Sequence, residues 1–217
     1  MARTIADSIT ADSPSDVGLF VPLVFLETVK EIVGDKLIVG AEMVTPEVNG
    51  AFTGGVSPGM LKSLGIEWAL AGHSERRTLN GETDEYINAQ CKLLVENDMN
   101  VILCIGETLE EFEKSLVDAI CEVQLKKGLA DIGADQMSAV TIAYEPVWAI
   151  GTGLVCSSED ASKYTILFSS RLVSSRCTMY FNFIYPLSPD RNQSNSNTSS
   201  FYFLSLLTIS SSQFNLI

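Results

Sequence analysis

The sequence predicts an α/β fold with a parallel sheet, because short apolar runs alternate with stretches of helical spacing from residue 17 to residue 167. Five of the runs have the length and the β-branched, apolar composition of buried strands. They are 17–22, 36–43, 67–73, 100–107 and 139–145. Strands that are buried on both faces and joined by helices occur in barrels and in doubly wound sheets, so both architectures remain open at this point.

The stretches between these runs carry helix signals. The segment 23–34 has helical apolar spacing and ends at a glycine. Ser57 is expected to cap the next helix, with Pro58 at its first position. Two further helices are predicted over 83–98 and 108–132. Strands and helices therefore follow one another in regular order.

The composition changes near residue 168. After Asp160 the single acidic residue is Asp190, and 192–217 carries no charge. The segment 168–217 is rich in Ser, Asn, Phe and Tyr and has no clear helix or strand period. We interpret it as a tail unrelated to the domain at 17–167, either disordered or an artefact of the gene model. Residues 1–16 are interpreted as an N-terminal extension.

Charge and cysteine usage exclude several classes of partner. With 27 acidic and 14 basic residues the formal net charge is -13, which argues against nucleic acid and anionic membrane surfaces as partners. The 5 cysteines form no Cys-x-x-Cys pair, and the single histidine argues against a multi-histidine metal site. Neither a signal peptide nor an apolar stretch of about 20 residues is recognisable. We expect a soluble cytoplasmic protein without a metal.

His73 ends the strand expected at 67–73, and Ser74 with Glu75 opens a short helix. Ligands of parallel α/β folds bind where strands end. The positive partial charge of a helix N-terminus disfavours an imidazolium, so a neutral ring could donate a hydrogen bond to a substrate carbonyl. The alternative is a histidine that only caps a loop.

Glu145 ends the strand expected at 139–145, and Pro146 prevents its continuation. Apolar neighbours would partly desolvate this carboxylate and raise its proton affinity, as a general base for carbon-acid chemistry requires. The segment 146–153 then suits a lid, with apolar side chains that pack on closure and glycines that ease hinge motion. The alternative is a solvated glutamate beside a tight turn.

A third strand end, at 104–107, carries Cys104 and Glu107. A catalytic cysteine needs a nearby base or cation, and this stretch contains neither. A buried packing cysteine is the preferred interpretation.

Three stretches together resemble the triosephosphate isomerase family in order and spacing. They are "NGAFTGGVSPGMLKSLGIEWALAGHSERR" (49–77), "VILCIGETLEE" (101–111) and "AYEPVWAIGTG" (143–153). The resemblance covers about 17–166. It implies an eight-stranded (β/α)8 barrel, of which strands two to six are visible. It also implies cofactor-free interconversion of glyceraldehyde 3-phosphate and dihydroxyacetone phosphate, in glycolysis and gluconeogenesis.

Residue roles follow from the same resemblance. Glu145 would move a proton between two substrate carbons, and His73 would polarise and protonate the enediolate oxygens. The backbone amide of Gly151 would hold the phosphate, and Glu75 would be a buried supporting carboxylate. The loop 49–54, with Thr53 near its tip, would reach into a second subunit and form a homodimer.

Other family features are not found in the sequence. The family's first strand carries an Asn-x-Lys motif, whereas the first lysine here is Lys30. The glycine-rich phosphate loops of strands seven and eight have no match after 167. Glu42-Met43 stands where the family usually has Gln-Asn, and Gly55 where it usually has a glutamate.

These departures predict that the chain as written is impaired or inactive. A noncatalytic barrel fragment that binds a complete subunit through 49–54 is the alternative. Another barrel enzyme acting on a phosphorylated sugar ranks third.

Overall fold

The computed structural model describes residues 1–10 and 15–150, and after these residues 152, 154, 156, 157, 160, 163, 164, 178–181 and 205–210. The helices are α1 (Ala2–Ser8), α2 (Leu26–Val33), α3 (Pro58–Ser63), α4 (Ser74–Leu79), α5 (Asp84–Glu96), α6 (Leu109–Glu113) and α7 (Val117–Gly128). The 3-10 turns are η1 (Leu23–Phe25), η2 (Met137–Ala139) and η3 (Val147–Ala149). The strands are β1 (Ser15–Val21), β2 (Ile38–Ala41), β3 (Trp68–Ala71), β4 (Asn100–Ile105), β5 (Val140–Tyr144), β6 (Thr178–Phe181) and β7 (Ser205–Ser210).

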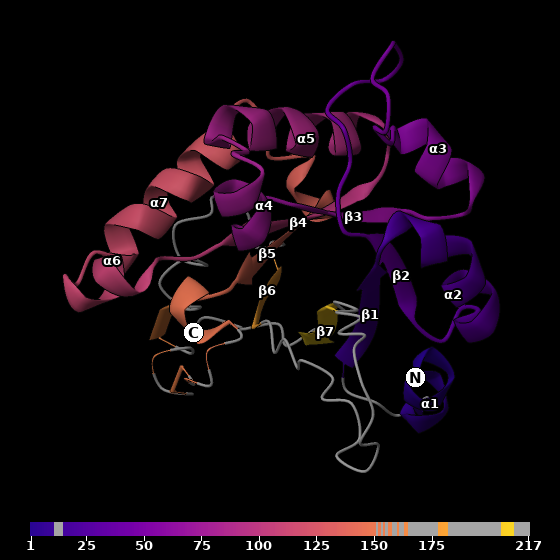
Figure 1. Ribbon diagram of the computed structural model, residues 1–217, viewed down its shortest axis with the longest axis horizontal. Coiled ribbons are helices and arrows are strands. Elements are labelled where there is room, and N and C mark those ends of the chain that lie inside the picture. The colour runs from indigo at the N-terminus through magenta and orange to yellow at the C-terminus, as the bar shows by residue number, and fades with distance from the viewer. Residues whose placement is uncertain are drawn as a thin grey trace, which may run out of the picture.

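The strands form one curled sheet in the order β6-β5-β4-β3-β2-β1-β7. Neighbouring strands from β1 to β6 pair in parallel, whereas β7 pairs antiparallel with β1. The helices α2, α5 and α7 pack on the outer side of the curl (Figure 1). All five strands predicted from the apolar runs are present as β1–β5. The prediction of a parallel α/β sheet is therefore confirmed.

Apolar side chains cover both faces of this sheet. The outer face and the helices share a large buried cluster that includes Leu19, Val39, Ala69, Leu103 and Ile142. The inner face of the curl carries a smaller buried cluster of Phe20, Leu70, Ile102, Cys104 and Ala143. Alternate residues of each strand supply the two clusters, which explains why the strand sequences are apolar without a polar alternation.

Inside the curl, the ring of Phe20 lies where a side chain of residue 40 would otherwise be, because residue 40 is a glycine. Phe20 of β1 is fully buried. A Cβ atom built on Gly40 of β2 would lie 2.2 Å from Cε1 of this ring. Such a distance is far inside van der Waals contact, so Gly40 must remain a glycine while Phe20 stays in place.

The structure confirms the predicted start of α3 but divides the helix predicted over 108–132 into two. Ser57 caps α3 as expected, because its side chain accepts a hydrogen bond from the backbone N–H of Met60. The prediction of one helix over 108–132 is wrong, since α6 ends at Glu113 and α7 begins at Val117. Between them Ser115 adopts φ 57°, in the left-handed region that interrupts a right-handed helix.

The segments outside 17–167 contain three described elements. The helix α1 packs against α2, and its Ala6 is buried. β6 and β7 lie in the segment where the sequence showed no strand period, and each extends the sheet at one edge. The remaining residues of 168–217 lie outside the described residues. Among the helices that the structure describes, none is both long and apolar enough to span a bilayer.

Candidate active site

The carboxyl ends of β3, β4 and β5 carry the polar side chains of the candidate site. His73 follows β3 after one glycine, Glu107 follows β4 after another, and Glu145 follows β5 directly. Because these three strands are parallel neighbours, their ends lie at the same edge of the sheet. Two residues predicted from separate motifs, His73 and Glu145, are thereby brought together.

His73 occupies the N-cap position of α4 and is buried. Its Nδ1 atom accepts a hydrogen bond from the backbone N–H of Glu75 at 3.3 Å. An imidazole nitrogen that accepts a hydrogen bond carries no proton, so the proton of the neutral ring resides on Nε2. Nε2 lies 3.5 Å from Oε2 of Glu145. The histidine therefore caps the helix α4, and its Nε2 atom also faces the second candidate residue.

Glu145 is buried, with 2% of its surface exposed. Its Oε1 atom accepts a hydrogen bond from the backbone N–H of Ser74 at 3.0 Å, while Oε2 faces His73. The alternative interpretation of a solvated glutamate is therefore wrong. A backbone amide and an imidazole thus contact the two oxygens of this carboxylate and restrict its position.

Gly106 allows β4 and β5 to approach closely next to Glu145. A Cβ atom at position 106 would lie 1.9 Å from the carbonyl oxygen of Glu145. The backbone N–H of Glu145 donates to the carbonyl oxygen of Ile105 at 2.8 Å, so the ladder between the strands continues to this residue. Only a glycine fits here, and a larger residue would displace the carboxylate.

Glu107 is a further residue of the site, and the sequence reasoning assigned it no role. It is fully buried and accepts hydrogen bonds from the hydroxyl of Tyr144 at 3.0 Å and from Nε1 of Trp148 at 2.7 Å. Burial raises the pKa of this carboxyl group, whereas the bonds from Trp148 and Tyr144 act in the opposite direction. Its backbone carbonyl also accepts from the N–H of Val147. The start of the segment 146–153 is therefore bonded to Glu107 at two points.

Cys104 matches the interpretation of a buried packing residue. It belongs to the inner apolar cluster and has no exposed surface. Burial, followed by the nearby Glu145 carboxylate, keeps the pKa of its thiol well above the usual range. A thiol that resists ionisation is a poor nucleophile.

Glu75, two residues after His73, and Glu42 are carboxyl groups close enough to interact electrostatically. Glu75 is half-buried rather than fully buried, and Glu42 follows β2 directly. Burial raises the pKa of Glu42 to about 7, and the Glu75 carboxylate adds to this effect while Arg76 opposes it. Glu42 stands where the family resemblance expects a glutamine. The strand end thus has an additional acidic group at the position of a neutral amide.

The loop with Thr53 projects from the sheet between β2 and α3 (Figure 1). Its base is closed because the backbone N–H of Thr45 donates to Val56 O at 2.8 Å, and Val56 N–H donates to Oγ1 of Thr45 at 2.9 Å. All residues of 49–54, Thr53 included, are exposed. Gly151, the expected phosphate contact, lies outside the described residues.

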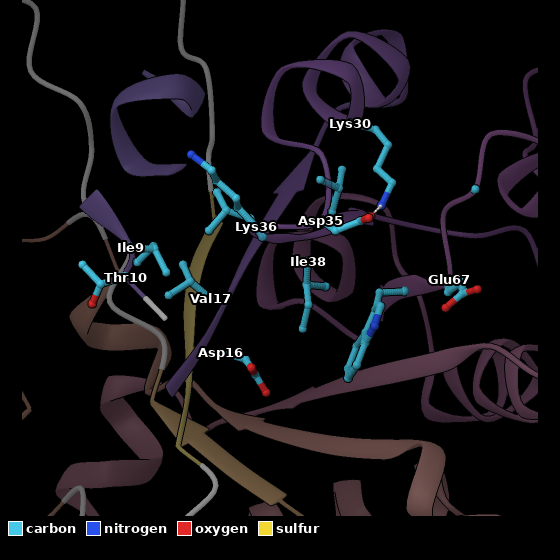
Figure 2. Close-up of a pocket in the computed structure, with 13 residues that line it drawn as sticks. Ile9, Thr10, Asp16, Val17, Lys30, Asp35, Lys36, Ile38 and Glu67 are labelled. Carbon is cyan, nitrogen blue, oxygen red and sulfur yellow. Dashed lines mark hydrogen bonds and ion pairs between the residues drawn. The ribbon is translucent and has the colours of Figure 1, made fainter. Parts of the chain in front are cut away.

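A cavity of about 500 Å³ lies at the opposite end of the strands (Figure 2). It is lined by residues at the amino ends of β1, β2 and β3, among them Asp16, Ile38 and Trp68. Lys30 also lines it and pairs with Asp35 at 3.4 Å. None of the residues of the candidate site takes part in this cavity. In the part of the chain that the structure describes, no group of three His, Cys, Asp or Glu residues is placed to hold a metal ion.

A curled parallel sheet with helices on its outer side has the architecture of an incomplete β/α barrel. A sequence profile of triosephosphate isomerase matches residues 1–177. The chain therefore belongs to the triosephosphate isomerase family, and β1–β5 are the recognisable part of its barrel. The profile match begins before the stretch 17–166 in which the motifs are found.

Curated relatives agree with this assignment. The triosephosphate isomerase of Carboxydothermus hydrogenoformans is 46% identical over 162 residues, which cover 74% of this chain and 64% of the relative. That of Lawsonia intracellularis is 45% identical over 146 residues, covering 67% and 58%. That of Treponema denticola is 49% identical over 128 residues, covering 59% and 51%. The chain thus spans between half and two thirds of the length of these relatives.

Proposed function

We propose that this chain carries the acid–base site of a triosephosphate isomerase, which interconverts glyceraldehyde 3-phosphate and dihydroxyacetone phosphate. The observation that carries the proposal is the buried carboxylate of Glu145 beside the Nε2 atom of His73, 3.5 Å away. A base and a hydrogen-bond donor at this separation can contact adjacent atoms of one small substrate.

The roles are those established for the family. Glu145 takes a proton from one carbon next to the carbonyl group and returns it to the neighbouring carbon. The electron pair left behind forms an enediolate, whose oxygens accept the hydrogen bond from Nε2–H of His73. Because Nδ1 of the ring already accepts from Glu75 N–H, only Nε2 is available as the donor.

We further propose that the 217-residue chain is severely impaired as a catalyst. The first lysine, Lys30, lines the cavity at the amino ends of the strands, so it cannot supply the cation that the family places beside its substrate (Figure 2). Loss of one such electrostatic donor typically lowers the rate about 100-fold or more. At the carboxyl ends of the strands, Glu75 and the partly ionised Glu42 add negative charge, which disfavours the binding of a phosphate ester further.

The assembly and setting belong to the proposal as well. A homodimer would form through the exposed loop 49–54, and Gly151 would bind the substrate phosphate through its amide. Glu75, half-buried behind His73, would support the histidine from the second residue of α4. The reaction would take place in the cytoplasm, as a step of glycolysis and gluconeogenesis.

A second candidate function is binding without catalysis. The exposed Phe52, with 48% of its surface accessible, lies in the loop 49–54 and favours a protein partner. The partner in this case is a complete isomerase subunit. Co-purification of this chain with a full-length isomerase, together with absence of turnover, would favour this second function.

The test of the first function is a coupled assay with glyceraldehyde 3-phosphate as substrate. The control is the Glu145→Gln variant, purified by the same steps, because it reports isomerase contributed by the expression host. Turnover of the parent chain above this control supports the proposed base. Equal rates for the two preparations would refute catalysis by this chain.

A further inference from the structure

The segment that follows Glu145 contains Trp148, which contacts an aromatic residue of the helix α6. Trp148, in the turn η3, packs its ring against the ring of Phe112 in α6. The ring centroids are 4.7 Å apart and the planes are inclined by 38°. Tilted aromatic pairs at this distance are favourable beyond the apolar surface that they bury.

The same tryptophan is bonded at its polar edge. Its Nε1–H donates to Oε1 of Glu107 at 2.7 Å, while its face contacts Phe112. Both partners come from one short stretch, because α6 begins two residues after Glu107. Thr108 and Glu111 form a capping box at this helix start, with Glu111 Oε2 accepting from Thr108 N–H at 2.8 Å. The capping box therefore fixes Phe112 relative to Glu107.

We propose that Phe112 is a positioning residue of the site, which holds Trp148 on Glu107 and thereby fixes the turn η3 behind Glu145. The indole cannot leave Glu107 without also separating from the Phe112 ring. Loss of an aromatic pair typically changes such an equilibrium about fivefold, so Phe112 increases the preference for the docked turn by this factor. The consequence for turnover rests on the proposed function, whereas the docking of Trp148 does not.

Tryptophan fluorescence can test this docking directly. The sequence contains 2 tryptophans, so a Trp68→Phe background leaves Trp148 as the sole emitter. In the full chain with this background, Phe112→Ala is expected to shift the emission of Trp148 to longer wavelength and to increase quenching by acrylamide. Phe112→Tyr keeps a ring at the same place and is expected to retain the emission of the background chain.

Leu109→Ala provides the matched control. Leu109 is the first residue of α6 and is 45% exposed, so its truncation removes an apolar side chain from the same helix while the Phe112 ring stays in place. The emission of Trp148 is expected to stay that of the background chain. Unchanged emission and quenching in Phe112→Ala, with an unchanged circular dichroism spectrum, would overturn the proposal. If Phe112→Ala does not fold, Phe112→Leu replaces it, and an emission equal to that of the background chain would have the same meaning.

The fluorescence result is separate from the assay of the proposed function. A chain without isomerase activity still reports whether Trp148 is docked. A red shift in Phe112→Ala together with equal rates for the parent and Glu145→Gln would uphold the positioning of Trp148 and refute catalysis.

Discussion

Glu145 and His73 follow two strands that do not pair with each other, yet their Oε2 and Nε2 atoms lie 3.5 Å apart. The strand β4 separates β3 from β5 in the sheet. The curl of the sheet turns both strand ends toward the same interior, and the helix start at Ser74 provides the amide that binds the Glu145 carboxylate. The geometry of the pair thus depends on the curvature of the sheet as well as on the two residues.

The tautomer of His73 is a direct prediction of its hydrogen bonds. Because Nδ1 accepts from the backbone N–H of Glu75, the neutral ring should carry its proton on Nε2. The sequence has a single histidine, so long-range proton–nitrogen correlation spectra of the labelled chain need no assignment by mutation. A proton on Nδ1 of the neutral ring would contradict the structure.

Substitution of Gly106 should displace Glu145. In Gly106→Ala the new Cβ would lie 1.9 Å from the Glu145 carbonyl oxygen, so the two strand ends must separate. We expect a loss of about 1–3 kcal/mol in the free energy of unfolding, typical of overpacking. Denaturant titration measures it. Gly59→Ala is the matched control. Its Cβ would lie 3.8 Å from Ser57 Oγ, an ordinary van der Waals contact, so the free energy of unfolding should stay equal or rise slightly.

Glu42 should make stability depend on pH. Its pKa is raised to about 7 in the folded chain, so folding favours the protonated carboxyl group. This contribution is fully present below the ordinary pKa of 4.5 and is lost as the pH rises through about 7. As the pH rises from 4.5 to about 7, the free energy of unfolding of Glu42→Gln should therefore increase relative to that of the parent chain. The expected increase is about 1–2 kcal/mol after allowance for solvent screening.

The experiment for Glu42 compares urea denaturation of the parent and Glu42→Gln at several pH values. Glu67→Gln removes the same charge from an exposed position and serves as the control. A stability difference between the parent and Glu42→Gln that stays constant from acid to alkaline pH would rule out the effect.

The loop 49–54 should determine the oligomeric state. Thr53 is exposed near the tip of this loop, whose base is closed at Thr45 and Val56. If the loop enters a partner subunit, Thr53→Arg should convert a dimer into a monomer without unfolding it, because a buried charge without a partner is costly. Sedimentation velocity of both chains measures this. A parent chain that sediments as a monomer would disprove the homodimer.

The strands could be predicted from the sequence because a strand that is buried on both faces is apolar along its whole length. In β4 all residues from Val101 to Ile105 are buried, so the run is continuously apolar. His73 and Glu145 could be selected because each stands where such a run ends. Their mutual distance could not, since it follows from the curl of the sheet and the register of β4 with both neighbours.

Other features have no local signal. The partners of Glu107 are Tyr144 and Trp148, which are 37 and 41 residues away in the chain. In the sequence, Glu107 is only a glutamate that follows a glycine, and nothing near it indicates its two hydrogen-bond partners. The break between α6 and α7 also has no local signal. Ser115 adopts a left-handed backbone conformation, which is usually occupied by glycine or asparagine, so a serine at this position does not predict a helix end.

The contact between the Phe20 ring and the backbone of Gly40 makes the substitutions that are tolerated at positions 20 and 40 depend on each other. Any side chain at position 40 would occupy the volume of the ring, and a smaller residue at position 20 would leave that volume empty. Neither site can change alone without loss of stability, so the two are expected to covary among descendants of this sequence. A lineage can acquire alanine at 40 most readily after the ring at 20 has been lost.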